Sequence, residues 1–397
     1  MRKNWIISQL FYPEETSTAY IMTKIAEMLV EESSVNVICG ASNYQSKNLH
    51  SKKLIHKDVK IFQIRTPLLN KNNLFHRIIL FSYFTLSVFI KLLFKVKKND
   101  TIIMVTNPPT LLFTIALLKC IKQFKFIVIL QDIFPENAAA SGLINNKSLL
   151  YKISLKAMNY GYKKADKLFA CGSDMAEHFI RKGIKSENII IIPNWADQDV
   201  LESLETINRN EYFNLNLNDR VVIEFAGNIG RVQGLDIFIK IFKKSTNKKL
   251  LLLIIGDGAN KQNLINYVVE NKLDNVIFFS SKPRHEQKYF LKSCNIGLIT
   301  LCKGMYGLGV PSKAYNLMAS SKAILYIGDE KSEIDNYINQ NNIGWSFSWD
   351  NEKEILHLLN NLIDPKEFIQ YGTNARDFAT NNFTEDIVLK KYKEHLN

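Results

Sequence analysis

The sequence predicts an α/β protein built from two parallel-sheet domains. Short apolar runs of strand length recur along the whole chain and alternate with longer segments of helical period. A chain of 397 residues is too long for one comfortable hydrophobic core. Residues 196–218 are polar with few large apolar positions, and this composition indicates a linker between two domains.

The expected strands are buried apolar runs. In the first half they span Trp5–Ser8, Val35–Cys39, Val59–Ile64, Thr101–Val105, Phe126–Leu130, Lys167–Ala170 and Ile189–Ile192. In the second half they span Val221–Phe225, Leu250–Ile255, Val276–Phe279, Ile296–Thr300, Ala323–Ile327 and Gly344–Phe347. Because helical segments separate them, we expect parallel sheets with helices on both faces. Such sheets bind ligands beyond the carboxyl ends of their strands.

Composition excludes several classes of protein. Hydrophobic residues at 46% and charged residues at 22% are typical of a soluble globular protein. The five cysteines are scattered, without a CxxC pair or a His/Cys cluster, which indicates free thiols in a reducing cytoplasm and argues against a structural zinc site. The apolar run near the start is short and meets Pro13, so we expect a first strand and not a signal peptide.

The net charge of +13, from 51 basic and 38 acidic residues, suggests an anionic partner. The candidates are an anionic membrane surface, an anionic substrate and nucleic acid, although richness in Lys and Asn alone would also raise the charge. The sequence contains no zinc finger, basic-region helix or aromatic-basic RNA-binding motif. We therefore expect no nucleic acid partner.

Residues 74–98 form the most apolar predicted helix. Its uncharged run, Ile78–Ile90, is shorter than the roughly 20 apolar residues that span a bilayer. Basic residues flank the run on both sides, so the helix could lie in the headgroup region of an anionic leaflet. An ordinary helix packed on the sheet is the alternative, and the sequence leaves both open.

A glycine-rich turn follows the first strand of the second half. Gly227, Gly230 and Gly234 separate this strand from a helix. Glycines let backbone N–H groups approach an anion, and Arg231 adds a planar cation suited to phosphate. We interpret the turn as a pyrophosphate cradle; a plain strand-to-helix turn is the alternative.

Other candidate residues follow later strands. Gly256 and Gly258 form a second strand-to-helix turn. A glycine loop, residues 304–309, leads into a helix that starts near Lys313. A helix dipole disfavours a cation at its N-terminus, so this lysine indicates a local anion such as phosphate; a solvated lysine is the alternative.

In the first half, carboxylates follow two strands. Glu14, Glu15 and the possible helix cap Thr16 follow the first strand, and Asp132 and Glu136 follow a central one. The second pair is either catalytic or acceptor-binding, or part of a capped loop. An Asp-x-Asp sequence at 197–199 lies in the expected linker, where chance explains it better than a metal site.

Six segments in order resemble glycosyltransferase family 4, retaining nucleotide-sugar transferases with two Rossmann-like domains, the GT-B architecture. They are ISQLFYPE, VILQDIFPENAAASGLI, the run from ADKLFACGSD to IIPNWAD, EFAGNIGRVQGLD, LLIIGDGANKQNL and GVPSKAYNLMASSKAIL. The similarity covers essentially the whole chain. It is strongest to a bacterial surface-polysaccharide subgroup that includes enzymes assigned to N-acetyl-L-fucosamine transfer.

The resemblance implies a domain plan and a reaction. Residues 1–200 would bind the acceptor, 201–380 would bind the nucleotide sugar, and 381–397 would cross back onto the first domain, with a cleft between the two. The expected reaction moves a sugar from UDP to a polyprenyl-diphosphate-linked saccharide at the inner face of the cell membrane, without cofactor or metal. Two alternatives stay open: a UDP-sugar 2-epimerase, and a non-catalytic subunit that binds nucleotide sugars.

The resemblance also assigns residues. Asp132, Glu136, Arg231 and Lys313 would be catalytic, and Glu14, Glu15, Thr16 and Asp132 would meet the acceptor. The donor would contact Gly227, Asn228, Gly230, Arg231, Gln233, Gly234, Gly256, Gly258, Ser281, Lys282, Pro283, Val310, Pro311, Ser312, Lys313 and Asn316. This chain departs from the family pattern: Gln233 replaces a lysine, Gln131 a histidine, and Leu308 and Asn316 the two acids of a Glu-x7-Glu signature.

Overall fold

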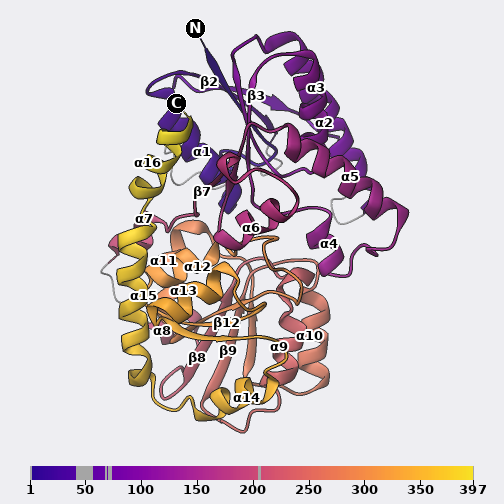
Figure 1. Cartoon of the computed structure of the whole chain (residues 1–397). Coiled ribbons are helices and arrows are strands. Elements are labelled where there is room, and N and C mark those ends of the chain that lie inside the picture. Colours follow the sequence, from indigo (N-terminus) through magenta and orange to yellow (C-terminus); the bar gives the residue numbers. More distant parts are fainter. Residues whose placement is uncertain (1, 42–56, 68, 70–73, 204–206, 397) are drawn as a thin grey trace. The chain divides into compact units, whose positions relative to one another are not determined.

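The computed structural model describes residues 2–41, 57–67, 69, 74–203 and 207–396; the side chains of Leu74, Phe75 and Arg77 lie outside the described part. The chain divides into two compact units (Figure 1). Unit 1 contains residues 1–139, 144–192 and 389–397, and unit 2 contains residues 140–143 and 193–388.

Unit 1 is built on a parallel sheet of seven strands with the order β3-β2-β1-β4-β5-β6-β7. The strands are β1 (Lys3–Ser8), β2 (Ser34–Gly40), β3 (Lys60–Ile64), β4 (Thr101–Val105), β5 (Lys125–Ile129), β6 (Lys167–Ala170) and β7 (Ile189–Ile191). The helices are α1 (Ser17–Val30), α2 (Leu74–Lys95), α3 (Thr110–Ile121), α4 (Glu136–Ala140), α5 (Leu149–Lys164) and α6 (Ser173–Arg181). β4 is buried along its whole length, as expected for a strand covered on both faces.

Unit 2 is built on a parallel sheet of six strands with the order β10-β9-β8-β11-β12-β13. The strands are β8 (Val221–Ala226), β9 (Leu250–Ile255), β10 (Val276–Phe279), β11 (Ile296–Thr300), β12 (Ala323–Ile327) and β13 (Gly344–Phe347). The helices are α7 (Gln198–Glu202), α8 (Arg209–Phe213), α9 (Leu235–Phe242), α10 (Lys261–Glu270), α11 (Gln287–Ser293), α12 (Lys313–Ala319), α13 (Glu333–Asn341), α14 (Glu352–Asn361) and α15 (Ile369–Asn382). Alternate residues of β8, such as Val221, Ile223 and Phe225, enter one hydrophobic core with α9.

Both sheets confirm the predicted α/β class, and each expected strand is present with ends shifted by two residues at most. The expected linker at 196–218 is wrong where the structure describes it. This stretch belongs to unit 2 and contains α7 and α8. Val200 and Phe213 are buried, so one apolar anchor in each short helix holds a polar segment onto the unit.

The last helix, α16 (Glu385–Leu396), ends inside unit 1. The ring of Tyr392 is fully buried and lies edge-on to Phe169 of β6, with ring centroids 5.6 Å apart. Lys393 forms an ion pair of 2.5 Å with Glu32. Contacts of its final two turns therefore attach the C-terminus to the first unit.

Helix α2 has one buried apolar face and one exposed apolar face. Phe84, Val88 and Leu92 are fully buried, and α3 contacts both α2 and α5. The other face exposes Leu86 by 59% and Phe94 by 80%. Over Ile78–Lys95 the helix is long and apolar enough to cross a membrane by length and composition, but 28% of that window is buried. The helix is thus both a layer of unit 1 and an exposed apolar surface.

Candidate functional site

The two glycine turns of unit 2 interlock through their backbones. The Gly227 N–H donates to Ile255 O at 2.9 Å, and the Ile229 N–H donates to Asp257 O at 2.9 Å. A Cβ on Gly256 would lie 1.9 Å from Gly227 O, and Gly256 has φ +146°, where other residues are strained. A Cβ on Gly258 would lie 2.4 Å from Ile229 O. The close approach of the two turns therefore requires glycine at both 256 and 258.

Gln233 holds the first turn in shape. Its side chain Oε1 accepts a hydrogen bond of 2.9 Å from the Gly230 N–H. Residues Arg231–Gln233 form a short 3-10 turn, and Gly234 ends it with φ +61°. The residue that replaces the family lysine is thus a cap for the turn, and its amide nitrogen remains available to a ligand.

Lys313 lies directly against this turn. Its Nζ is 3.3 Å from the position of a Cβ on Gly227 and 3.2 Å from the ring centroid of Phe225. The atom is buried and makes no hydrogen bond within the described residues. Burial lowers the pKa of the ammonium well below its ordinary value, because desolvation disfavours the charged form. Buried polar groups normally have a hydrogen-bond partner, and the described residues supply none to this amine.

Arg231 supplies a second cation with a different character. Its side chain is exposed and makes no hydrogen bond or ion pair to any described residue. Asn228, in the same turn, is exposed as well. The turn therefore offers one buried amine, one free guanidinium and a side-chain amide.

The second glycine turn is tied to the end of β10. Asp257 accepts from the Ser281 N–H at 3.2 Å, from Ser281 Oγ at 2.9 Å and from Lys261 Nζ at 2.9 Å. Hydrogen bonding by Lys261 lowers the pKa of the exposed Asp257 carboxyl. Lys282 turns away toward Glu286 and the ring of Tyr212, while Pro283 stays exposed. These contacts fix the segment expected to touch the base.

Asn316 is engaged in the structure of unit 2 itself. Its Oδ1 accepts from the Asp197 N–H at 2.7 Å, and its Nδ2 donates to Gln287 Oε1 at 3.0 Å. The Asp197 carboxylate pairs with Arg284, so the suspected Asp-x-Asp sequence is part of an ion pair. Leu308, at the other position of the acid signature, is buried at 5% exposure. Leu308 thus contributes to packing, and Asn316 contributes to a hydrogen-bond network.

The segment from 304 to 313 is fixed by Asp329. Its carboxylate accepts from the Gly304 N–H at 3.0 Å and from the Tyr306 N–H at 2.7 Å. Val310 is buried, whereas Pro311 and Ser312 are partly exposed just before Lys313. This loop therefore leads to the lysine along a defined backbone path.

In unit 1, the carboxylates after β5 have different surroundings. The N–H groups of Gln131 and Asp132 donate to Thr106 Oγ1 at 3.2 and 3.3 Å, and Asp132 as a whole residue is exposed. Glu136 is ion-paired with Lys182, and its Oε1 lies 3.7 Å from His178 Nε2.

Glu136 is an ionised structural carboxylate in this arrangement. Burial opposes its ionisation, but its hydrogen bonding to His178 and Lys182 prevails and lowers its pKa. The sequence gave no sign of these two partners, because they lie more than 40 residues away on and after α6. In Asp132, by contrast, desolvation raises the pKa of the carboxyl above its ordinary value.

The loop after β1 contains Glu14, Glu15 and Thr16, and it leaves the same sheet at a strand's carboxyl end, as the loop after β5 does. Thr16 caps α1 by accepting from the Ala19 N–H at 3.3 Å. Glu14 is partly exposed and Glu15 is exposed. Burial, with Glu14 as a second cause, raises the pKa of the Cys39 thiol to about 12.

The predicted site residues thus form two sets, one in each unit. Those of unit 1 are Glu14, Glu15, Thr16, Asp132 and Glu136, and the cations Arg231 and Lys313 belong to unit 2. Over the described part of the chain, no group of three His, Cys, Asp or Glu side chains could hold a metal ion.

Comparison with known proteins identifies relatives of this chain. Residues 208–377 match the sequence model of the family described as Glycosyl transferases group 1. The matched residues lie within unit 2. The probable glycosyltransferase WbjE of Pseudomonas aeruginosa is 29% identical over 400 residues, which cover 99% of this chain and 97% of that protein. The putative colanic acid biosynthesis glycosyl transferase WcaI of Escherichia coli K12 is 29% identical over 164 residues, 40% of each chain.

Solved glycosyltransferase structures share the fold along the whole chain. HepE of Anabaena, in complex with UDP-glucose, has a TM-score of 0.73 at 15% identity and covers 100% of this chain and 99% of its own. WaaG, a glycosyltransferase of lipopolysaccharide biosynthesis, has a TM-score of 0.70 at 12% identity, with 98% of each chain covered. These matches confirm the predicted GT-B pair of Rossmann-like sheets.

Proposed function

We propose that the protein is a glycosyltransferase of bacterial surface-polysaccharide biosynthesis. It transfers a sugar from a UDP-sugar, with retention of anomeric configuration, to a lipid-linked saccharide of a capsule or O-antigen pathway. N-acetyl-L-fucosamine is the candidate sugar, on the basis of the sequence resemblance. The observation that carries the proposal is the buried, unpaired amine of Lys313 against the Gly227–Gly234 turn.

The chemistry asks the protein to stabilise a leaving diphosphate. When the bond between the anomeric carbon and the diphosphate oxygen breaks, negative charge develops on UDP. Pre-placed donors are the most effective way to stabilise such charge. Lys313 and Arg231 supply these donors, and Gln233 adds a neutral amide, whereas the N–H groups of Gly227, Ile229 and Gly230 are already bonded within the turns. We therefore expect turnover without a divalent metal.

The acceptor belongs to unit 1 in this proposal. Asp132 is the candidate base for the acceptor hydroxyl, because it follows the end of β5 and desolvation raises the pKa of its carboxyl, as suits a general base. Glu14, Glu15 and Thr16 would contact the acceptor saccharide. Glu136 is assigned a positioning role, since its ion pair with Lys182 occupies one carboxylate oxygen.

We also propose that α2 docks the protein on the anionic inner face of the cell membrane. Ile78, Leu86 and Phe94 expose more than half of their surface, and Lys95 is exposed at the end of the same helix. Apolar side chains next to lysines suit the headgroup region, where each nearby lysine contributes about 1 kcal/mol. A lipid-linked acceptor would be met at the same surface.

Release of UDP tests the reaction. Purified protein is incubated with a panel of UDP-sugars, with and without a polyprenyl-diphosphate-linked saccharide. Acceptor-dependent release supports the transferase. Release without acceptor would favour a 2-epimerase, and binding without release a non-catalytic subunit.

Arg231→Ala probes the same assay from the protein side. Loss of a donor to the leaving group typically costs about 100-fold or more, roughly 2.7 kcal/mol. We expect a loss of that size in turnover, with unchanged thermal stability because the side chain is exposed and unpaired. Lys240→Ala, on the exposed side of α9, is the matched control. Near wild-type turnover would remove Arg231 from the mechanism.

Vesicle co-sedimentation tests the membrane role. Changing Lys95, Lys97 and Lys98 to Glu should weaken binding to vesicles that contain an anionic phospholipid by more than about tenfold. The control changes Lys248, Lys249 and Lys366, exposed lysines of unit 2, to Glu with the same change in net charge. Equal binding by both triple variants would exclude α2 as the docking surface.

A further inference from the structure

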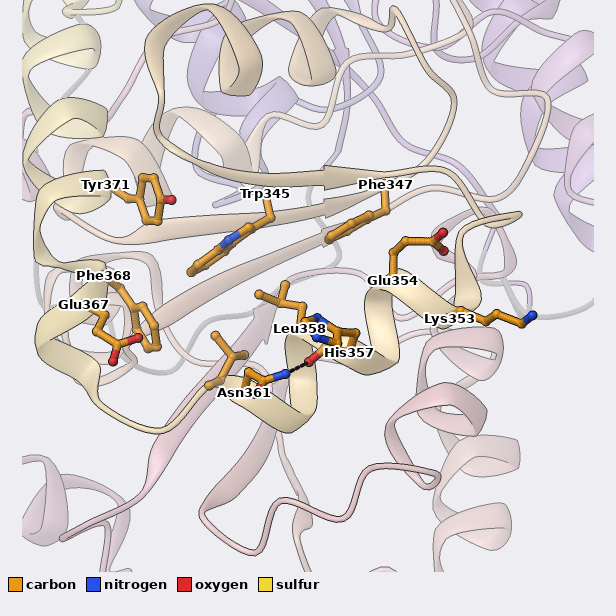
Figure 2. A pocket seen from close by; sticks show the side chains of 11 residues that line it. Trp345, Phe347, Lys353, Glu354, His357, Leu358, Asn361, Glu367, Phe368 and Tyr371 are labelled. Carbon is orange, nitrogen blue, oxygen red and sulfur yellow. Dashed lines mark hydrogen bonds between the residues drawn. The ribbon is translucent and has the colours of Figure 1, made fainter.

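A pocket of about 740 Å³ lies beside β13, the last strand of the unit 2 sheet (Figure 2). Its walls come from β13, α14 and the chain from 367 to 371. No residue of the two glycine turns lines it, and neither does Lys313. It is thus separate from the proposed donor site, and its volume is within the range of about 300–1,000 Å³ that small-molecule sites have.

The pocket has an aromatic wall. Trp345 and Phe347 are two residues apart on β13, so they face the same side of the strand, and both point toward α14 in Figure 2. The Trp345 ring is held edge-on by Phe368 at 5.5 Å and by Tyr371 at 4.9 Å between centroids. These contacts fix the indole plane, while Trp345 and Phe347 stay partly exposed.

Hydrogen-bonding groups surround this wall. Glu354 and His357 of α14 and Glu367 are exposed. None of their side chains makes a hydrogen bond or ion pair to a described residue. Asn361 donates to the His357 carbonyl at 2.8 Å, which holds its amide against the helix. The rings of Trp345 and Phe347 and the carboxylates of Glu354 and Glu367 therefore line one pocket.

The local charge limits what can bind. Two carboxylates, of Glu354 and Glu367, outnumber the single ammonium of Lys353, in a chain whose net charge is +13. Such a rim repels phosphates, which disfavours a nucleotide or a lipid diphosphate. Carboxylates accept hydrogen bonds from hydroxyl groups, and flat aromatic faces pack against the C–H faces of sugar rings. A neutral saccharide matches both features.

We propose that this pocket binds a neutral saccharide segment, namely part of the glycan that the protein elongates. The inference rests on the proposed function, because a glycosyltransferase of polysaccharide assembly meets such a glycan as acceptor and product. Binding here would hold a longer chain on unit 2 at a place other than the donor site.

Tryptophan fluorescence of the full-length protein tests the pocket. Chitotetraose and maltotetraose are titrated as neutral probes in the presence of saturating UDP. We expect a saturable change with a millimolar or lower Kd, which Trp345→Phe removes while it preserves an aromatic ring. Glu354→Ala combined with His357→Ala should weaken binding by about tenfold, or 1.4 kcal/mol. Glu270→Ala, an exposed carboxylate of α10, is the control and should bind as the parent does.

Three outcomes would overturn the proposal. They are no saturable change with either probe, a change that persists in Trp345→Phe, and competition between UDP and the saccharide. UDP binding, measured separately by calorimetry, keeps the two proposals distinct. A protein that binds the saccharide but not UDP would contradict the proposed transferase. A protein that binds UDP but not the saccharide would contradict only the pocket.

Discussion

Replacing Lys313 by methionine should have opposite effects on UDP affinity and on stability. The methionine keeps an unbranched apolar stem but removes Nζ, which is buried and unpaired at 3.2 Å from the Phe225 ring centroid. A ring can attract an ammonium by about 2 kcal/mol when both are desolvated. Desolvation acts in the opposite direction and lowers the pKa of Lys313 well below its ordinary value.

The magnitudes follow from the two states of the amine. Without UDP, a buried polar group that lacks a partner costs about 1–3 kcal/mol, so Lys313→Met should raise the free energy of unfolding by an amount in this range. With UDP, a lysine about 4 Å from a phosphate attracts it by about 4 kcal/mol at an effective dielectric constant of 20. After the cost of desolvation, we expect a loss of about 2–3 kcal/mol, which weakens UDP binding by roughly 30- to 150-fold.

Two measurements check this prediction. Isothermal titration calorimetry gives the Kd for UDP, and urea unfolding gives the stability of the same preparation. Binding by the parent protein should also take up protons at alkaline pH, because an arriving phosphate raises the pKa of a depressed lysine. A Lys313→Met variant that is less stable, or that binds UDP like the parent, would refute the assignment of Lys313 as a phosphate ligand.

Three further changes probe the scaffold. Gly256→Ala should destabilise unit 2 by more than about 3 kcal/mol, since its Cβ would meet Gly227 O at 1.9 Å and φ is +146°; a normal urea midpoint would contradict the interlocked turns. Burial raises the pKa of the Glu224 carboxyl well above its ordinary value. The free energy of unfolding should therefore fall as pH rises above the pKa of the unfolded state, by at most about 1.4 kcal/mol per pH unit. Glu224→Gln should flatten this pH profile, and an unchanged slope would exclude Glu224 as its cause. Lys182→Met should destabilise unit 1 by about 3–5 kcal/mol, because it leaves the Glu136 carboxylate without its ammonium partner. The double variant with Glu136→Gln should recover most of this loss, as measured by thermal unfolding. A double variant no more stable than Lys182→Met would show that the ion pair is not the cause.

The strands were predictable because local sequence alone specifies them. The run Leu250–Ile255 is apolar at every position, and a run of this pattern and length is typical of a strand buried on both faces. The stretch at 196–218 was misread for the converse reason. One buried side chain, Val200, attaches an otherwise polar helix, and a single apolar residue leaves no periodic signal.

The candidate site was predictable to the level of its turns, but not of its partners. The glycine spacing predicted N–H groups that approach an anion, whereas the structure uses Gly227 and Gly256 for a close contact between the two turns. The use of Asn316 to bind the backbone of Asp197 depends on residues 119 positions apart, which only the folded chain brings together. The pocket beside β13 likewise needs β13 and α14 to pack before its rings and carboxylates surround one space.

The interlocked glycine turns have a consequence for changing the specificity of this protein. The carbonyl of Gly227 occupies the space that a side chain at 256 would need, so neither turn can gain bulk unless the other moves. New selectivity for a donor sugar must then come from side chains carried outside this backbone contact, such as Asn228 and Ser312. Libraries directed at those positions should yield folded variants far more often than libraries directed at the turns.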